Sequence, residues 1–384
     1  MARPIYLDYQ ATTPLDARVF AAMRPYFEEK FGNPHSATHR YGWEAAAGVD
    51  VARGEVAALI GAAPEDIIFT SGATEANNLA LKGVMRAHAP AGKDHLITVA
   101  TEHKCVLETA LALEREGMKL TLLPVGGDGL IETAALEAAI TARTALVSVM
   151  LVNNEIGVIQ PLAEIARVTR ERGVLLHSDA AQAFGKLDIN VNELGVDLMS
   201  ISGHKIYGPK GVGALYVGRR DKPIRLIPHM DGGGQEAGVR SGTLSPALCA
   251  GLGKAAALAR VEMAADAAKA RRHWHMLRDG LRAYAPDLVV NGSEKARLWS
   301  NLNLSFPGID GERLLADARA VALSSGAACA SAVSGPSYVL AALGVPQKLA
   351  RASLRIGTGR FTSDDEIAQA VASIGAAIAR QKRA

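Results

Sequence analysis

Short apolar segments alternate with longer helical stretches through the middle of this chain, and this alternation constrains its fold more than any other feature. A parallel strand that is buried on both faces needs an apolar run, and a helical crossover then returns the chain to the same end of the sheet. The pattern therefore predicts an α/β fold with a mostly parallel central sheet flanked by helices. The expected strands are 67–70, 96–100, 120–124, 145–152, 174–177, 198–201 and 214–217, and the expected helices are 45–59, 74–86, 106–116, 162–172 and 246–284.

A second pattern begins near residue 288 and indicates a smaller α+β region at the carboxyl end. It contains apolar runs at 301–306 and 354–356 and a final helical stretch at 363–380. A chain of 384 residues also exceeds the size at which a single hydrophobic core usually stops growing. We therefore expect a large domain over residues 16–260 and a small domain built from residues 1–15 and 261–384.

Charge and cysteine content exclude several classes of protein. The 42 basic and 39 acidic residues leave a net charge of +3 without a basic block, which argues against a nucleic-acid or membrane-surface binder. Asp8 stands where a signal peptide needs an apolar run, and no later stretch has spanning length. Three cysteines without metal-site spacing make neither a disulfide framework nor a zinc site. We expect a cytoplasmic protein without a structural metal.

Polar motifs follow the predicted strands where ligands collect in such sheets. The segment Thr70-Ser71-Gly72-Ala73-Thr74-Glu75 opens a helix whose free N–H groups suit a phosphate, although helix capping explains it equally well. Asp179 ends one strand, and Lys205 lies on a glycine-bounded turn after the next. A lysine for a Schiff base, a carboxylate for a pyridinium nitrogen and helix N–H groups for a phosphate are the minimum for pyridoxal phosphate.

The segment 324–332 consists of eight small residues and Cys329, and Gly335-Pro336 follows shortly after it. Such a composition predicts a mobile loop, which suits a thiol that must attack a substrate and then deliver a group elsewhere. Cys105 opens an apolar helical stretch and Cys249 lies among apolar residues, so we expect both to serve packing.

Taken together, the motifs resemble those of the cysteine desulfurases of the class V aminotransferase fold. The resemblance extends from Tyr6-Leu7-Asp8 to Arg355. It rests on the segments Thr101-Glu102-His103-Lys104, Val152-Asn153-Asn154-Glu155-Ile156-Gly157, Asp179-Ala180-Ala181-Gln182 and Ser202-Gly203-His204-Lys205. It implies a pyridoxal-phosphate transferase of fold type I, with the small domain carrying the catalytic cysteine loop.

The resemblance also implies roles for individual residues. Lys205 would hold the cofactor covalently, Asp179 would pair with its ring nitrogen, and His103 would stack on the ring and take part in proton transfer. Gln182 and Asn154 would lie near its phenolic oxygen. The full set of cofactor-binding residues that it implies is Ala73, Thr74, His103, Asn154, Asp179, Gln182, Ser202, His204, Lys205 and Thr243.

For the substrate, L-cysteine, the resemblance implies that Arg355 grips the carboxylate and that Asn33 approaches it, although Asn33 also fits a turn before proline. Cys329 would take the sulfur as a persulfide and leave alanine. It would then pass the sulfur to an acceptor such as an iron–sulfur scaffold, whose cluster it could ligate transiently. Thr243 would reach the site of a neighbouring subunit, which implies a homodimer.

Other functions stay open at this point. A selenocysteine lyase or a transaminase shares the fold, an inactive scaffold could merely bind the acceptor, and a nucleic-acid binder is disfavoured by charge. The residues around Cys329 and at 356–359 differ from housekeeping relatives, and the chain ends at Ala384 without their longer tail. The acceptor, and a nitrogenase-type or housekeeping role, are therefore left undecided.

Overall fold

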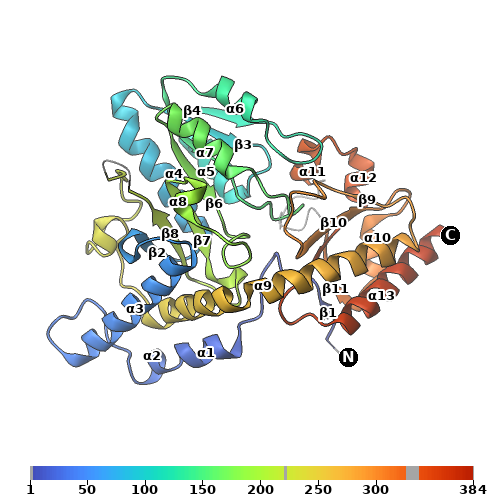
Figure 1. Cartoon of the computed structure of the whole chain (residues 1–384), viewed down its shortest axis with the longest axis horizontal. Coiled ribbons are helices and arrows are strands. Elements are labelled where there is room, and N and C mark those ends of the chain that lie inside the picture. Colours follow the sequence, from blue (N-terminus) through green and yellow to red (C-terminus); the bar gives the residue numbers. More distant parts are fainter. Residues whose placement is uncertain (1–2, 220–222, 326–336, 384) are drawn as a thin grey trace.

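A seven-stranded sheet forms the centre of the computed structural model, which describes residues 3–219, 223–325 and 337–383 (Figure 1). The strands lie in the order β2-β8-β7-β6-β5-β3-β4. All neighbours are parallel except β8, which is antiparallel to both β2 and β7. The seven predicted strands are confirmed as β2 (Ile67–Thr70), β3 (His95–Val99), β4 (Lys119–Leu123), β5 (Thr144–Ser148), β6 (Leu175–Asp179), β7 (Leu198–Ser202) and β8 (Gly213–Val217).

Helices cover both faces of this sheet. Successive strand residues point to opposite sides, so Ile97 and Val147 join one apolar core while Leu96 and Leu146 join another. The predicted helices are confirmed as α3 (Arg40–Leu59), α4 (Ala73–His88), α5 (Lys104–Arg115), α7 (Leu162–Glu171) and α9 (Pro246–Arg282). The predicted α/β class is therefore correct.

The carboxyl-terminal region has a core of its own. Its four-stranded antiparallel sheet has the order β12-β13-β10-β9, and helix α13 (Asp364–Lys382) packs with it. Leu7 from the chain start joins this core together with Trp274 from the second half of α9, which runs along both regions in Figure 1. A separate core agrees with the expected division into two domains. The domain bounds 16–260 and 1–15 with 261–384 stay a prediction. The strands are β9 (Val289–Val290), β10 (Asn301–Ser305), β12 (Ser324–Ser325) and β13 (Ser353–Gly357), and β1 (Ile5–Tyr6) pairs separately with β11 (Val321–Ala322).

Short elements complete the described part of the chain, and the sequence did not predict them. Most are single helical turns or little more: α1 (Ala17–Met23), α2 (Pro25–Glu28), α6 (Thr133–Ala139), α8 (Val191–Leu194), α10 (Gly311–Asp317), α11 (Tyr338–Ala342) and α12 (Gln347–Arg351). Within the ranges that the structure describes, no helix combines the length and the apolar character needed to cross a membrane.

A buried histidine lies in the middle of the central sheet. His177 on β6 has no exposed surface, and its ring nitrogens are 2.8 Å from Ser148 Oγ and 3.0 Å from Ser200 Oγ. Burial lowers the pKa of His177 to about 3. The unfolded chain, with an ordinary histidine pKa of about 6.5, therefore binds a proton at a pH where the folded chain does not. The free energy of unfolding therefore decreases as the pH falls from about 6.5 towards 3, because protons bind His177 in the unfolded chain only.

We expect His177→Asn to flatten the acid dependence of folding. Between pH 7.5 and pH 5 the proton linkage of His177 amounts to about 2 kcal/mol of unfolding free energy. Urea denaturation of the wild type and the variant at both pH values isolates this contribution, because all other titrating groups are shared. The same loss of stability in both proteins would contradict a neutral buried His177.

Candidate active site

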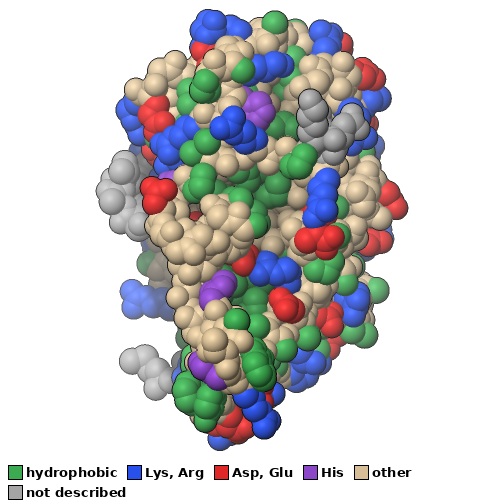
Figure 2. Space-filling view, turned by 90° about the vertical axis from the view of Figure 1, so that its left-hand side faces the viewer, with side chains coloured by type: hydrophobic (Ala, Val, Ile, Leu, Met, Phe, Trp, Pro, Cys, Tyr) green, Lys and Arg blue, Asp and Glu red, His purple; other side chains and the backbone are tan. Residues whose placement is uncertain are grey.

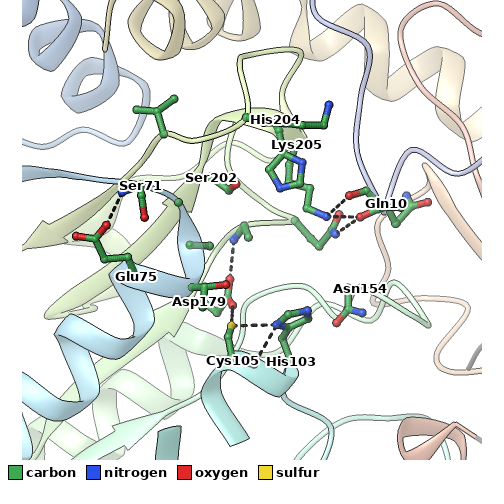
Figure 3. A pocket seen from close by; sticks show the side chains of 18 of the residues that line it. Gln10, Ser71, Glu75, His103, Cys105, Asn154, Asp179, Ser202, His204 and Lys205 are labelled. Atoms are coloured by element: carbon green, nitrogen blue, oxygen red, sulfur yellow. Dashed lines mark hydrogen bonds between the residues drawn. The ribbon is translucent and has the colours of Figure 1, made fainter. Parts of the chain in front are cut away.

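A cavity of about 570 Å³ opens where the carboxyl ends of the central strands meet the start of the chain. The turns after β2, β6 and β7 and the beginning of α5 line it, as the topology of a parallel sheet requires. Figure 3 shows the side chains that converge there. Of the residues predicted from the sequence, the cavity is lined by Ala73, Thr74, His103, Asn154, Asp179, Gln182, Ser202, His204 and Lys205.

One end of the cavity is suited to an anion. Helix α4 begins at Ala73 with no side chain capping it, so the N–H groups of its first turn remain available to a ligand. A Cβ on Gly213 would lie 2.7 Å from the Cα of Gly72, so a glycine is required for this turn to pass so close to β8. Ser202 and His204 line the same cavity. Burial lowers the pKa of His204 to about 4, so its ring is neutral at pH 7.

Lys205 lies on the 3-10 turn Gly203–Lys205 directly after β7. Its Nζ donates to the carbonyl oxygens of Gln10 at 2.5 Å and Ala11 at 2.8 Å. The start of the chain is held at this place by Thr13, whose backbone and hydroxyl groups both donate to the His204 carbonyl. The amine is thus presented to the cavity by two chain segments that are far apart in the sequence (Figure 3).

Asp179 ends β6 and is 4% exposed. One carboxylate oxygen accepts a hydrogen bond from the N–H of Ala181, and the other accepts from Asn77 Nδ2, both at 2.8 Å. No lysine or arginine of the described chain forms an ion pair with it. Hydrogen-bond donors therefore stabilise this carboxylate.

His103 caps the N-terminus of α5, because its Nδ1 accepts from the N–H of Cys105 at 3.2 Å. Burial lowers the pKa of His103, which favours the neutral ring that a proton acceptor needs. The Sγ of Cys105 is 2.9 Å from the same Nδ1 and 3.9 Å from Asp179. Burial raises the pKa of the Cys105 thiol to about 12, so it is no thiolate at neutral pH.

Two amide side chains also line the cavity. Gln182 donates to the Gln10 carbonyl at 2.9 Å and accepts from Lys186 at 3.2 Å. Asn154 is buried, and its Oδ1 has no hydrogen-bond partner among the described residues. An unsatisfied buried oxygen is costly, so the Asn154 side chain is suited to a polar ligand group.

Other predicted residues lie outside this cavity. Arg355 on β13 is buried behind Asn154, donates to its carbonyl at 3.4 Å and pairs with Asp8 at 2.8 Å. Thr243 is exposed and does not line the cavity of its own chain. Asn33 is also exposed, and its Oδ1 accepts from the N–H of His35, which is the turn geometry expected before proline. Cys329 lies outside the described residues.

The structure adds site residues that the sequence motifs did not single out. Gln10, Asn77 and the buried Glu102 all lie close to the predicted groups, and burial raises the pKa of Glu102 well above its usual range. Glu75 pairs with Arg240 at 2.7 Å and so ties the α4 turn to the segment that precedes Thr243. The only sequence signal for Asn77 is a polar residue on the otherwise apolar face of α4.

The residues present fit pyridoxal phosphate. An uncapped helix start suits its phosphate, the Lys205 amine suits its aldehyde and the Asp179 carboxylate suits its ring nitrogen. The Asn154 oxygen, which no described residue contacts by a hydrogen bond, suits its polar ring substituent. These groups line one cavity of matching size.

Comparisons with known proteins agree with this geometry. Residues 5–369 match the family model of class-V aminotransferases. A protein named cysteine desulfurase IscS from Rickettsia bellii is 54% identical over 369 residues, which cover 96% of this chain and 89% of that protein. The solved structure of a NifS-like protein matches with a TM-score of 0.90 at 34% identity, covering 97% of this chain and 98% of the other. The structure of SspA in complex with cysteine matches with a TM-score of 0.84 at 37% identity, covering 94% and 100%.

Proposed function

The chain belongs to the aminotransferase class-V family and is a cysteine desulfurase, and from this premise we propose which of its residues carry out the reaction. The observation that carries the proposal is that the Lys205 amine, the Asp179 carboxylate and the uncapped start of α4 line one cavity. The substrate is L-cysteine and the products are L-alanine and a persulfide on Cys329.

The cofactor is pyridoxal 5'-phosphate, which withdraws electrons from the α-carbon of an amino acid bound to it. The first turn of α4 with Thr74, together with Ser202 and His204, would hold its phosphate. Asp179 would hold its ring nitrogen in the charged form, and Asn154 and Gln182 would face its phenolic oxygen. Both amides line the cavity with donors or acceptors available.

Two groups of this chain would move protons. The Lys205 amine, which two backbone carbonyls orient, would take the proton from the α-carbon of cysteine. Burial lowers the pKa of His103, which favours a neutral ring, and this ring would exchange a proton with the substrate on the same side of the cavity as Cys105. The guanidinium group of Arg355 would bind the substrate carboxylate. In the structure this guanidinium forms an ion pair with Asp8.

Sulfur transfer would use the Cys329 thiolate. It attacks the substrate sulfur, an S–S bond forms, and the substrate C–S bond breaks. The electron pair of that bond stays on carbon and takes up a proton, which gives alanine without an external oxidant or reductant. The described residues on either side of the Cys329 segment are held close to the proposed substrate-binding residues, since Ser324 accepts from Arg355 at 3.2 Å and Ser337 donates to Glu155, the neighbour of Asn154.

The activity itself is tested with purified protein reconstituted with pyridoxal phosphate. We expect cysteine and a thiol reductant to yield alanine and sulfide in equal amounts, without any keto acid. Parallel assays with cysteine sulfinate and selenocysteine distinguish a desulfurase from a selenocysteine lyase. Cysteine consumption only when pyruvate is added, with 3-mercaptopyruvate and alanine as products and no sulfide, would indicate a transaminase. Protein that binds no coloured cofactor would indicate an inactive scaffold.

We further propose that the protein forms a homodimer in which Thr243 reaches the site of the partner subunit. The exposed rings of Phe27, Phe31, Tyr41 and Trp43 lie close together in the sequence, and Phe31 stacks on Tyr41 with ring centroids 5.3 Å apart. Figure 2 views the left-hand side of the molecule in Figure 1, and it shows hydrophobic side chains and histidines gathered at the lower end of that face. Exposed apolar patches of this kind mark interfaces. Asn33 lies on the same exposed segment, and its proposed role is the one that the family resemblance implies, an approach to the substrate carboxylate.

Delivery of the sulfur to an acceptor protein such as an iron–sulfur scaffold is also part of the proposal. It is supported by the relatives named IscS. A cytoplasmic location agrees with the described cysteines, Cys105 and Cys249, which are both free thiols.

A further inference from the structure

Asn77 is the direct hydrogen-bond partner of Asp179 inside the protein. It lies in the second turn of α4 with no exposed surface, and its Nδ2 donates to Asp179 Oδ2 at 2.8 Å. The same amide nitrogen is 3.1 Å from the sulfur of Cys105. Cys105 in turn contacts the ring nitrogen of His103 at 2.9 Å. The Asn77 amide thus contacts Asp179 directly and is linked to His103 through Cys105. Figure 3 shows Asp179, Cys105 and His103.

The charges around Asp179 make a donor at this place necessary. The carboxylate is almost fully buried, and it has no ion pair within the described ranges of the chain. Glu102 is buried close by, and burial together with the charge of Asp179 raises its pKa well above the usual range, so it supplies no positive charge. Burial lowers the pKa of His103, which favours its neutral ring, and Cys105 stays protonated because burial raises its pKa to about 12. The Lys205 amine lines the same cavity, and its positive charge acts on His103.

An asparagine at this buried position lowers the stability of the fold unless its polar groups are used. Its neighbours on the buried face of α4 are apolar, Ala76, Leu79 and Ala80 among them, and its own Oδ1 is buried without a partner in the described part of the protein. A helix that only had to pack would carry a leucine there. The amide is retained with one unsatisfied oxygen, and its donor group is directed at Asp179.

We propose that Asn77 is a positioning residue. It holds the Asp179 carboxylate ionised and in the orientation that the ring nitrogen of the cofactor requires. Cys105 is the weaker second contact to the same oxygen, at 3.9 Å. The inference rests on the proposed function, because it assigns the ring nitrogen to Asp179. Without the amide, the Asp179 carboxylate would lose a hydrogen-bond donor that holds it in place, and it would support a protonated ring nitrogen less strongly.

The test compares Asn77→Leu, which keeps the size but removes the donor, with the wild type. We expect the variant to bind pyridoxal phosphate about 10- to 100-fold more weakly in equilibrium dialysis, the range by which the loss of such a supporting hydrogen bond weakens metal binding at metal sites. We also expect the ¹⁵N resonance of cofactor labelled at the ring nitrogen to move towards the unprotonated position. Asn291→Leu is the matched control, because Asn291 is equally buried and hydrogen-bonded but belongs to the core of the carboxyl-terminal region.

Asn77→Asp gives a second, independent readout. Two carboxyl groups in contact keep one proton between them, so this variant supplies a donor only while that proton remains. Its cofactor affinity should approach that of the wild type at low pH and fall as the pH rises. This readout also serves if the leucine variant does not fold.

The outcomes separate the two hypotheses. Wild-type protein that binds no cofactor would refute the proposed function. Wild-type binding together with an unchanged affinity and ¹⁵N resonance in Asn77→Leu would refute the role of Asn77 alone. An Asn77→Asp variant whose affinity relative to the wild type does not change with pH would refute it as well. Equal losses in Asn77→Leu and Asn291→Leu would reduce the effect to general destabilisation and also overturn it.

Discussion

Lys205→Ala is expected to lower alanine formation from cysteine by about 10³-fold or more, because one change removes both the covalent attachment of the cofactor and the group that takes the α-proton. The Nζ of Lys205 is directed into the cavity by the carbonyls of Gln10 and Ala11. An alanine at this position leaves the cavity wall intact, since the backbone of the turn is held by Thr13. The loss should therefore be chemical, with folding preserved.

The visible absorbance of the bound cofactor reports this change directly. We expect the wild-type band to be lost in Lys205→Ala, and a small added amine such as methylamine to restore part of the activity, because it replaces the missing amine in the vacated space. Lys119→Ala is the matched control, because Lys119 is an exposed lysine at the start of β4, on the far edge of the sheet.

Borohydride reduction followed by peptide mass analysis identifies the lysine that carries the cofactor. The alternative nearby is Lys186, whose pKa burial lowers to about 7 and whose amine is therefore a better nucleophile at neutral pH. Lys186 lines a second cavity, and Gln182 lies between its amine and the first. The cofactor should be found on the Lys205 peptide. Its presence on Lys186 would refute the assignment.

The central sheet could be predicted because its strands are simple to recognise. Strands buried on both faces are continuous apolar runs, and Ile67–Thr70 was predicted with its exact ends. The site residues at the strand ends were predictable for the same reason. Asp179 and Lys205 lie shortly after the apolar runs 174–177 and 198–201, and the carboxyl ends of parallel strands meet at one edge.

The partners of these residues could not be predicted, because they come from distant parts of the chain. Gln10 meets Lys205 across 195 positions and Asn77 meets Asp179 across 102. Arg240 meets Glu75 across 165. No local pattern encodes such contacts. Short helices such as Ala17–Met23 were missed for a related reason, since their stability depends on packing, here against α9.

Cys329→Ser is expected to abolish persulfide formation while the cofactor band remains. A hydroxyl is a far weaker nucleophile towards sulfur than a thiolate, so sulfide release should fall by at least about 10²-fold. The other two thiols are unsuited to replace it. Burial raises the pKa of both Cys105 and Cys249 to about 12, so neither is ionised at pH 8.

Cysteine labelled with ³⁵S distinguishes the three thiols in the wild-type protein itself. After a short incubation without reductant, the label should be found on the peptide that contains Cys329, and a thiol reductant should release it as sulfide. Cys249→Ala is the control, because Cys249 lies in the apolar core away from the site, and it should retain the label. Label on the Cys105 peptide, or a Cys329→Ser variant with full sulfide release, would mean that sulfur leaves cysteine by another route. In that case the lysine and the cofactor would still be required, and only the acceptor of the sulfur would have to be reassigned.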